Sequence, residues 1–94
     1  MDDNNSKFGS GPFILLKKSL TASAKIYVLT NDHHKFTGYL RSFDKHCNLI
    51  IENVTEIWHE KKKNNKKIIT KEKYSPIIFL RGDTIIIVSK FHAN

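Results

Sequence analysis

The chain has 94 residues and one cysteine, with 27% charged residues, 39% hydrophobic residues and a formal net charge of +7. This length predicts a single small domain that buries about 60–65% of the surface its unfolded chain would expose, so an isolated copy should be only modestly stable. The lone Cys47 excludes an internal disulfide and suits a reducing compartment, where we expect it to act as a small apolar filler. No apolar run approaches the ~20 residues of a membrane span, and the polar N-terminus does not resemble a secretion signal.

The first element along the chain is predicted to be a short helix. Residues 1–9 are polar and lack periodicity, so we expect a disordered tail there. Pro12 suits the first turn of a helix. An apolar stripe at helical spacing follows, made of Phe13, Leu16 and Leu20. We therefore predict a helix from about Pro12 to Leu20 that is too short to be stable unless its stripe packs on the domain.

An alternating apolar pattern follows the helix. Residues 26–30 are predicted to form a first strand, which a polar turn over 31–34 connects to a second strand over 35–43. The second strand places alternate residues on one face, namely Phe36, Gly38, Leu40 and Ser42. A glycine inside a strand weakens it unless the sheet bends or another backbone comes close. Gly38 therefore predicts a strongly curved sheet, as in a small barrel.

A loop and a third strand come next. The loop over 44–47 separates the second strand from residues 48–58, which resume the sheet with a kink near Asn53. Residues 71–80 are predicted to form a fourth strand, in which Pro76 cannot donate a ladder hydrogen bond and favours an edge position or a bulge. Residues 84–89 form a nearly continuously apolar fifth strand, so its second face needs a cover that a neighbouring molecule could supply.

Most of the positive charge lies in one internal stretch. Residues 60–73 contain seven lysines and two glutamates and so carry +5, which leaves +2 of the total of +7 for the rest of the chain. We expect a lysine-rich loop here, which could be a solvated loop, a contact to phosphates or a nuclear-import signal. The candidate phosphate contacts are Lys61, Lys62, Lys63, Lys66 and Lys67.

Two short motifs lie on either side of this stretch. Phe43-Asp44-x-His46-x-Asn48-Leu49 resembles the first motif of the Sm and Sm-like family, and Leu80-Arg81-Gly82-Asp83-x-Ile85-x-x-Val88 resembles the second. The resemblance covers residues 11–90. It implies a mainly β fold, with a short N-terminal α-helix followed by a strongly bent five-stranded antiparallel SH3-like small barrel, the Sm fold.

The resemblance also implies how the chain is divided. A single Sm domain would span 10–94, with its first motif at about 25–58 and its second at about 74–90. The lysine-rich insertion, together with His46-Cys47-Asn48 and Glu56-Ile57-Trp58, makes the chain similar to one spliceosomal type within the family.

Assembly and partners follow from the same resemblance. Spliceosomal members of the family form rings of seven different paralogues around a single-stranded uridine-rich site in small nuclear RNA, and the fourth strand of each subunit pairs with the fifth strand of the next. We therefore expect a core ring subunit of small nuclear ribonucleoproteins that supports pre-mRNA splicing. Its location would be nuclear, with assembly in the cytoplasm. We expect no cofactor, metal, membrane partner or enzymatic activity.

The resemblance places a nucleotide pocket on the two motif loops. His46 takes the position of the base-stacking side chain, where an aromatic face contributes roughly 1–3 kcal/mol per base. Asn48 takes the position of the base-edge reader, because its amide offers a donor and an acceptor that can match O4 and N3–H of uracil. Asp44 would hold the loop through hydrogen bonds to the backbone.

The second motif would complete the pocket. Arg81 would cover the other face of the base by planar stacking or cation–π contact. Gly82 would allow a tight turn with a positive φ, and Asp83 would either tie the loops together or pair with Arg81. One subunit then holds about one nucleotide, so useful affinity requires several pockets in one ring. The lysines would add salt-sensitive attraction to phosphates.

Three other interpretations stay open. A subunit of an Sm-like ring for RNA decay or processing would use the same pocket. A metal-dependent nuclease would use Cys47 and several histidines, although their spacing fits no closed zinc pattern. These histidines are His33, His34, His46 and His59. A barrel that binds peptides through a strand edge would leave Asn48 and Arg81 without a role.

Overall fold

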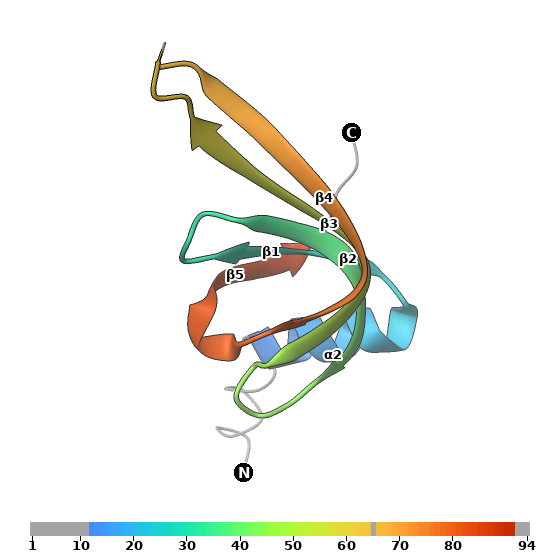
Figure 1. The fold of residues 1–94 in the computed structure, drawn as a ribbon. Helices are drawn as coiled ribbons and strands as arrows, with labels where there is room; N and C mark the ends of the chain where they lie inside the picture. The colour runs from blue at the N-terminus through green and yellow to red at the C-terminus, as the bar shows by residue number, and fades with distance from the viewer. Residues whose placement is uncertain (1–11, 65, 92–94) are drawn as a thin grey trace.

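The residues that the structure describes form one α-helix and five antiparallel strands (Figure 1). This computed structural model describes residues 12–64 and 66–91, with side chains from Ile14 onward, and the tail predicted over 1–9 lies outside these residues. The elements in order are α2 (Pro12–Ala22), β1 (Lys25–Thr30), β2 (Lys35–Phe43), β3 (Leu49–Lys61), β4 (Ile68–Leu80), the 3-10 turn η1 (Gly82–Thr84) and β5 (Ile85–Lys90). The predicted fold class, a short helix before a bent five-stranded antiparallel sheet, is confirmed.

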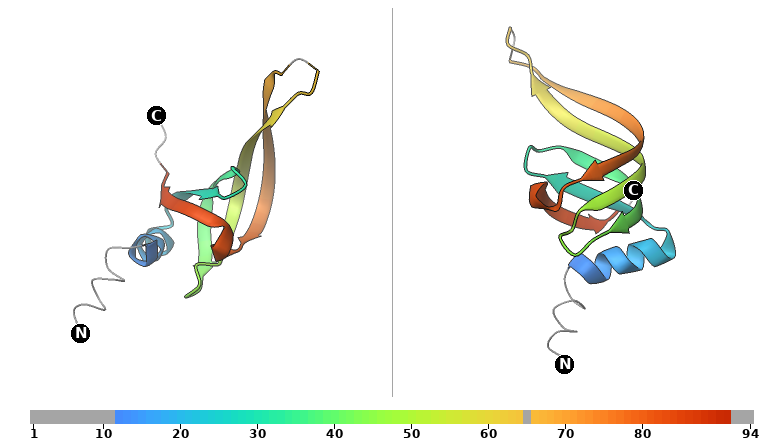
Figure 2. Two further views of the ribbon diagram at one scale, coloured as in Figure 1. Left: turned by 90° about the vertical axis from the view of Figure 1, so that its left-hand side faces the viewer. Right: turned by 60° about the horizontal axis from the view of Figure 1, so that its bottom comes forward.

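The strands form one sheet in the order β4-β3-β2-β1-β5. All neighbours pair antiparallel, and β4 and β5 are the two edges. The sheet is so strongly bent that it partly encloses its concave face (Figures 1 and 2). The 3-10 turn η1 connects the two edge strands, β4 and β5. Pro76 lies on β4, so its predicted place on an edge strand is confirmed.

Gly38 and Asn53 mark the bend. The register between β2 and β3 shifts beside Gly38, and Asn53 on β3 has φ of 52°, in the left-handed region that non-glycine residues seldom adopt. A Cβ atom on Gly38 would lie 2.7 Å from Cγ2 of Ile51 and 2.8 Å from the carbonyl oxygen of Glu52. The missing side chain therefore lets β3 approach β2 closely, and both the predicted curvature and the predicted kink are confirmed.

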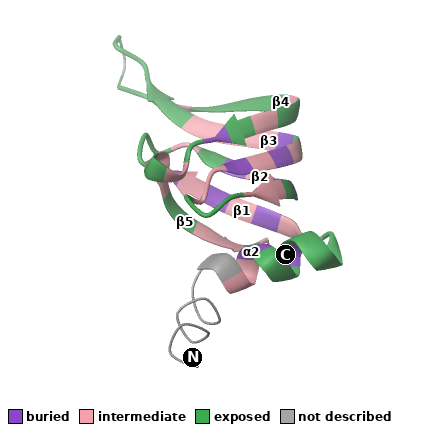
Figure 3. Cartoon of the chain, turned by 90° about the horizontal axis from the view of Figure 1, so that it is seen from below, coloured by how far each residue is buried: buried purple, intermediate pink, exposed green. Residues whose placement is uncertain are grey.

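The core lies on the concave face of the sheet, under the helix (Figure 3). It consists of Leu16, Ile26, Val28, Phe36, Leu40, Leu49, Ile51, Val54 and Leu80. Residues from β1, β2 and β3 alternate between buried and more exposed positions, as half-buried strands do.

The helix buries only part of its apolar stripe against the sheet. It contacts β2 and β5, and it runs to Ala22, two residues beyond the predicted end. Leu16 is fully buried, but Leu20 is 39% exposed, and Ser19 is buried in its place. Leu20 of the apolar stripe is therefore partly exposed, and the buried positions of the helix are Leu16 and Ser19, which are three residues apart and lie on one face. No helix in the described ranges is long and apolar enough to cross a membrane.

The lysine-rich stretch is mostly strand, which differs from the loop predicted over 60–73. β4 begins at Ile68, three residues earlier than expected, and the ladder continues to the pair Lys61–Ile68. Only residues 62–67 lie between the two strands. The β-branched residues 68–70 favour an extended backbone, and this preference outweighs the charge of the neighbouring lysines.

The hairpin of β3 and β4 projects beyond the rest of the sheet (Figure 2). The ladder between β2 and β3 ends at the pair Lys35–Ile57, so from Trp58 onward β3 pairs with β4 alone. We refer to residues 58–71 as the lysine ribbon.

Both edge strands expose large apolar side chains. On β4 these are Ile68, Tyr74, Ile77 and Phe79, and on β5 they are Ile86 and Ile87, all between 48% and 69% exposed. The fifth strand is apolar as predicted. None of its residues is fully buried within the described part of the chain, and Ile86 and Ile87 are both exposed.

Candidate functional site

The carboxylate of Asp44 organises the loop between β2 and β3. Its Oδ1 accepts hydrogen bonds from the backbone N–H groups of His46 at 2.8 Å and Asn48 at 3.0 Å, and its Oδ2 accepts one from Asn48 Nδ2 at 2.9 Å. Cys47 has φ of 63°, and its side chain packs against the core as a partly buried filler. The loop is therefore a tight turn that Asp44 holds through local hydrogen bonds, as predicted.

The amide of Asn48 connects the two motif loops. Its Oδ1 accepts a hydrogen bond from the backbone N–H of Gly82 at 2.7 Å, while its Nδ2 donates to Asp44. These two bonds fix the orientation of the amide plane. They leave one N–H and one lone pair of the amide unused, since a primary amide carries two of each. The amide of Asn48 thus keeps one donor and one acceptor in addition to the bonds that hold the two loops.

Gly82 is required by a close approach and not by its backbone angle. Its φ is not positive, so the predicted left-handed turn is wrong. A Cβ atom at this position would lie 1.9 Å from the carbonyl oxygen of His46 and 2.9 Å from the carbonyl carbon of Cys47. Any side chain would therefore push the second loop away from the first and break the hydrogen bond to Asn48.

Arg81 and Asp83 form an ion pair at the surface. Nη2 of Arg81 lies 2.7 Å from Oδ2 of Asp83, and the two side chains are 69% and 62% exposed. Of the two predicted roles for Asp83, the structure has the pairing with Arg81, while Asn48 ties the loops together. Such exposed pairs contribute little to stability, about 0–1 kcal/mol, but they limit the directions in which the guanidinium can point.

These residues surround an open hollow of about 570 Å³. It is lined by His46, Asn48, Phe79, Arg81, Gly82 and Asp83. All but Phe79 were predicted from the sequence. Phe79 lies on β4 two residues before Arg81, whose backbone is still extended, so the two side chains point to the same side, and Phe79 is 60% exposed. From the sequence, an apolar residue inside a strand is expected to lie in the core. Only the two-residue spacing between Phe79 and Arg81 could have indicated that Phe79 borders the same hollow.

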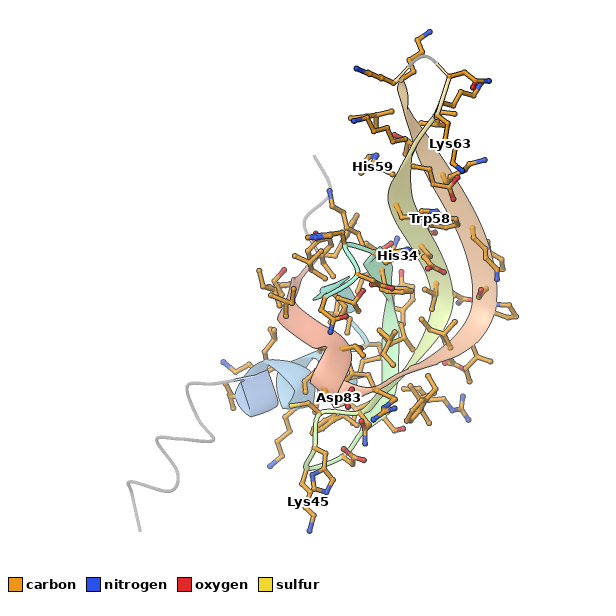
Figure 4. All side chains as sticks on the ribbon, turned by 60° about the vertical axis from the view of Figure 1, so that its left-hand side comes forward. His34, Lys45, Trp58, His59, Lys63 and Asp83 are labelled. Atoms are coloured by element: carbon orange, nitrogen blue, oxygen red, sulfur yellow. The ribbon has the colours of Figure 1, made fainter. Side chains whose placement is uncertain are left out.

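The predicted phosphate-binding lysines lie at the other end of the molecule. Figure 4 shows Lys63 near the tip of the lysine ribbon and Asp83 and Lys45 at the opposite end. The five lysines in question are all exposed: Lys61, Lys62, Lys63, Lys66 and Lys67. They cannot contact the same nucleotide as the hollow.

The histidines of the described ranges do not gather into a metal site. No group of three His, Cys, Asp or Glu side chains within those ranges could hold a metal ion. His34 Nδ1 instead lies 2.5 Å from Glu56, and His59 Nδ1 lies 3.1 Å from the hydroxyl of Thr70. The zinc-nuclease interpretation therefore finds no support in the arrangement of these side chains.

The profile of the LSM domain family matches residues 16–90, which include both loops and all the strands. The chain belongs to the LSM domain family. Within this family it is 36% identical over 84 residues to the small nuclear ribonucleoprotein Sm D2 of Saccharomyces cerevisiae, and the alignment covers 89% of this chain and 74% of that protein. It is 37% identical over 94 residues to a probable Sm D2 of Dictyostelium discoideum, covering 95% and 80%.

Solved structures of the same family share the fold. A heptameric archaeal Sm protein aligns with a TM-score of 0.59 and 26% identity, covering 82% of this LSM chain and 96% of the archaeal one. The resemblance predicted from the two motifs, including the similarity to a spliceosomal type, is confirmed by the Sm D2 relatives.

The pKa of Asp44 provides a test of the loop geometry. The hydrogen bond from the side chain of Asn48, helped by the backbone N–H groups of Asn48 and His46, lowers the pKa of Asp44 below its usual value. Because the ionised form is the one that is held, the order of the loop should persist above about pH 4 and be lost as the pH falls through the lowered pKa. The carboxyl carbon of Asp44, followed by NMR, should titrate below about pH 3.9.

A matched variant isolates the cause. Asn48→Ala removes the largest contribution, so its midpoint for Asp44 should move back toward the ordinary value. Lys45→Ala, in the same loop, should leave the midpoint in place. A midpoint at or above the ordinary value in the unmodified chain would contradict the hydrogen-bonding scheme.

Proposed function

We propose that the chain is a core subunit of small nuclear ribonucleoproteins and binds one nucleotide of a single-stranded uridine-rich site in small nuclear RNA. The observation that carries this proposal is the amide of Asn48, which is tied to Asp44 on one side and Gly82 on the other at the edge of an open hollow. The similarity to Sm D2 proteins supports the same conclusion. Support of pre-mRNA splicing in the nucleus, after assembly in the cytoplasm, is part of the proposal.

The hollow suits a flat base that presents both a donor and an acceptor. The unused N–H of Asn48 can donate to O4 of uracil, and its unused lone pair can accept from N3–H. Cytosine carries an amino donor in place of O4, so a rigid amide discriminates between the two bases. The imidazole of His46 and the guanidinium of Arg81 come from different loops and can cover opposite faces of the ring.

The exposed edges support a role in a ring. Unpaired N–H and C=O groups on an edge strand invite another strand, and rings remove such edges by closing on themselves. Here β4 and β5 are the edges of the sheet, and both carry exposed apolar side chains. In the proposed assembly, β4 of one subunit pairs with β5 of the next among seven Sm paralogues. Several pockets then bind one RNA strand together, which raises the effective concentration at each.

The lysine ribbon supplies charge and no base contact in this proposal. Its exposed lysines attract phosphates of the RNA outside the nucleotide that the hollow holds, and this attraction weakens with salt. No catalytic step is assigned to the chain: its titratable side chains at the hollow serve to shape a loop or to stack.

The native complex distinguishes this function from the main alternative. When the tagged chain is isolated from its own cells, small nuclear RNAs and other Sm paralogues should co-purify, and both can be identified by sequencing and mass spectrometry. A set of RNA-decay or processing factors would contradict the proposal and assign the chain to an Sm-like ring of that kind.

Two substitutions separate base reading from base stacking. In the assembled ring, Asn48→Ala should weaken binding to a uridine-rich oligonucleotide about tenfold and reduce its preference over a cytidine-rich one. Arg81→Ala should weaken binding to both oligonucleotides by a similar factor, because stacking does not depend on the base edge. Fluorescence anisotropy with labelled oligonucleotides measures both effects.

The control for these variants is Lys45→Ala, which changes an exposed side chain of the same loop that does not line the hollow. It should bind both oligonucleotides almost as the unmodified ring does. Failure of Asn48→Ala or Arg81→Ala to assemble into the ring would mean that these residues are structural and would contradict their proposed roles.

The edge-pairing argument predicts that the isolated chain does not remain a monomer. At micromolar concentration it should self-associate or aggregate, and a paralogue with a complementary edge should suppress this. Ile77→Lys places a charge on the exposed edge of β4 and should reduce the association, whereas Leu20→Lys, on the exposed side of α2, should not. Sedimentation velocity measures the species present, and a stable monomer of the unmodified chain would refute edge pairing.

A further inference from the structure

The lysine ribbon leaves the sheet at a defined point. The last pair between β2 and β3 is Lys35–Ile57, and His34 is the residue immediately before that pair on the β2 side. Beyond it, β3 and β4 continue for four more pairs without a third strand. Two-stranded ribbons are only marginally stable in water and twist readily. The sheet itself therefore does not determine the direction of the ribbon relative to the domain.

Three side chains meet where the ribbon leaves the sheet, and Figure 4 shows two of them, His34 and Trp58, near each other. His34 Nδ1 lies 2.5 Å from Oε2 of Glu56, and the imidazole stacks on the indole of Trp58 with ring centroids 5.0 Å apart and planes inclined by 4°. The side chains of His34 and Glu56 are only 25% and 20% exposed. We call His34, Glu56 and Trp58 the clasp.

The clasp is anchored to the body of the domain. The imidazole of His34 lies 6.3 Å from the ring of Phe36, which belongs to the core. The carbonyl oxygen of His34 accepts hydrogen bonds from the backbone N–H of Thr30 at 3.0 Å and from its hydroxyl at 3.2 Å, and Thr30 is buried. His34 therefore has a fixed position from which to hold Trp58.

The other side of the clasp reaches into the ribbon. Trp58 Nε1 donates to Oε2 of Glu60 at 2.9 Å. Trp58 pairs with Lys71 and Glu56 pairs with Lys73 across the β3–β4 ladder. The clasp thus connects the core to the first pairs of the ribbon through one continuous set of contacts, and five lysines lie beyond it.

We propose that His34, Glu56 and Trp58 are positioning residues that hold the lysine ribbon in one direction, so that its lysines meet the phosphates of RNA outside the nucleotide held between the motif loops. The inference rests on the proposed function and adds the residues that fix the direction of the positively charged ribbon. A ribbon held in place loses less conformational freedom on binding than a mobile one, so its phosphate contacts are stronger. His46 and Asn48, at the opposite end, keep their role in base recognition.

The experiment measures how salt weakens RNA binding in the assembled ring. Each phosphate contact to a single strand contributes about 0.7 to the slope of log K against log salt. The probe is a uridine-rich oligonucleotide extended on both sides by single-stranded segments. His34→Ala should lower the slope by about one or more and weaken binding several-fold at low salt, while the preference for uridine over cytidine stays unchanged.

A second clasp variant and a matched control accompany His34→Ala. Glu56→Gln keeps the size of the side chain but removes its charge, and it should give a smaller change in the same direction should His34→Ala fail to fold. His33→Asn is the matched control, because His33 is exposed at φ of 66°, a conformation that asparagine tolerates. It should change neither the slope nor the affinity.

Trp58 reports the clasp directly. It is the only tryptophan in the chain, so 5-fluorotryptophan introduced into this subunit alone gives one fluorine resonance in the ring. His34→Ala should shift and broaden that resonance, since the stacked imidazole is lost and the ribbon becomes mobile. An unchanged resonance would overturn the proposal, as would an unchanged salt slope.

A ribbon without its five outer lysines closes the test. When the lysines beyond the clasp are replaced by glutamine, the slope should fall, and adding His34→Ala should then have no further effect, because the clasp acts only through them. These lysines are Lys61, Lys62, Lys63, Lys66 and Lys67, and Lys71 beside Trp58 is kept. An equal effect of His34→Ala in that background, or no effect of the five substitutions, would overturn the inference. A ring that does not prefer uridine-rich over cytidine-rich RNA would refute the proposed function instead.

Discussion

One hydrogen-bonded link holds the two motif loops together, namely the amide of Asn48 between Asp44 and Gly82. Asn48 and Gly82 are 34 residues apart in sequence, yet the backbone nitrogen of Gly82 and Oδ1 of Asn48 lie 2.7 Å apart. The link exists because β2 and β3 present one loop, β4 and η1 present the other, and Gly82 has no side chain to separate them. In the proposed function, a base that enters the hollow would meet groups that are already oriented. Binding would then require little reorganisation of the protein.

The same strands that build the hollow leave the sheet unfinished. A domain of this size has a small core, and the two edge strands expose six large apolar side chains. One hollow also offers too few contacts for tight binding of RNA. In the proposed ring, pairing β4 with β5 of a neighbour would cover the edges and bring several hollows onto one RNA strand. Stability and function would then depend on the same association.

Local features of the fold and site were predictable from the sequence, and long-range ones were not. Strand alternation predicted the sheet, and Gly38 predicted its curvature, because both signals lie within a few neighbouring residues. Asp44 was correctly expected to hold its own loop for the same reason. The need for a glycine at 82 was assigned to a positive φ, whereas the real cause is the carbonyl of His46 from the other loop. Only the packing of distant segments shows such a cause.

Other long-range features escaped for similar reasons. Phe79 reads as an ordinary core residue because strand patterns do not indicate which face borders a binding site. The stack of His34 on Trp58 joins residues that are 24 positions apart, and the histidine had suggested only metal binding. The lysine-rich stretch was expected to be a loop because charge dominates its composition. The β-branched residues 68–70, which follow the lysines, extend the β3–β4 ladder into this stretch.

In the proposed function, the two ends of the molecule contribute two kinds of interaction to RNA recognition. The hollow would use short hydrogen bonds and stacking, which depend closely on geometry and respond weakly to salt. The lysine ribbon would use charge, which acts over about 8–10 Å and is screened by salt. Charge alone cannot distinguish one base from another, and one hollow alone offers few contacts. A fixed direction for the ribbon would make the two compatible, because an RNA strand with a base beside Asn48 could then also reach the lysines in one arrangement.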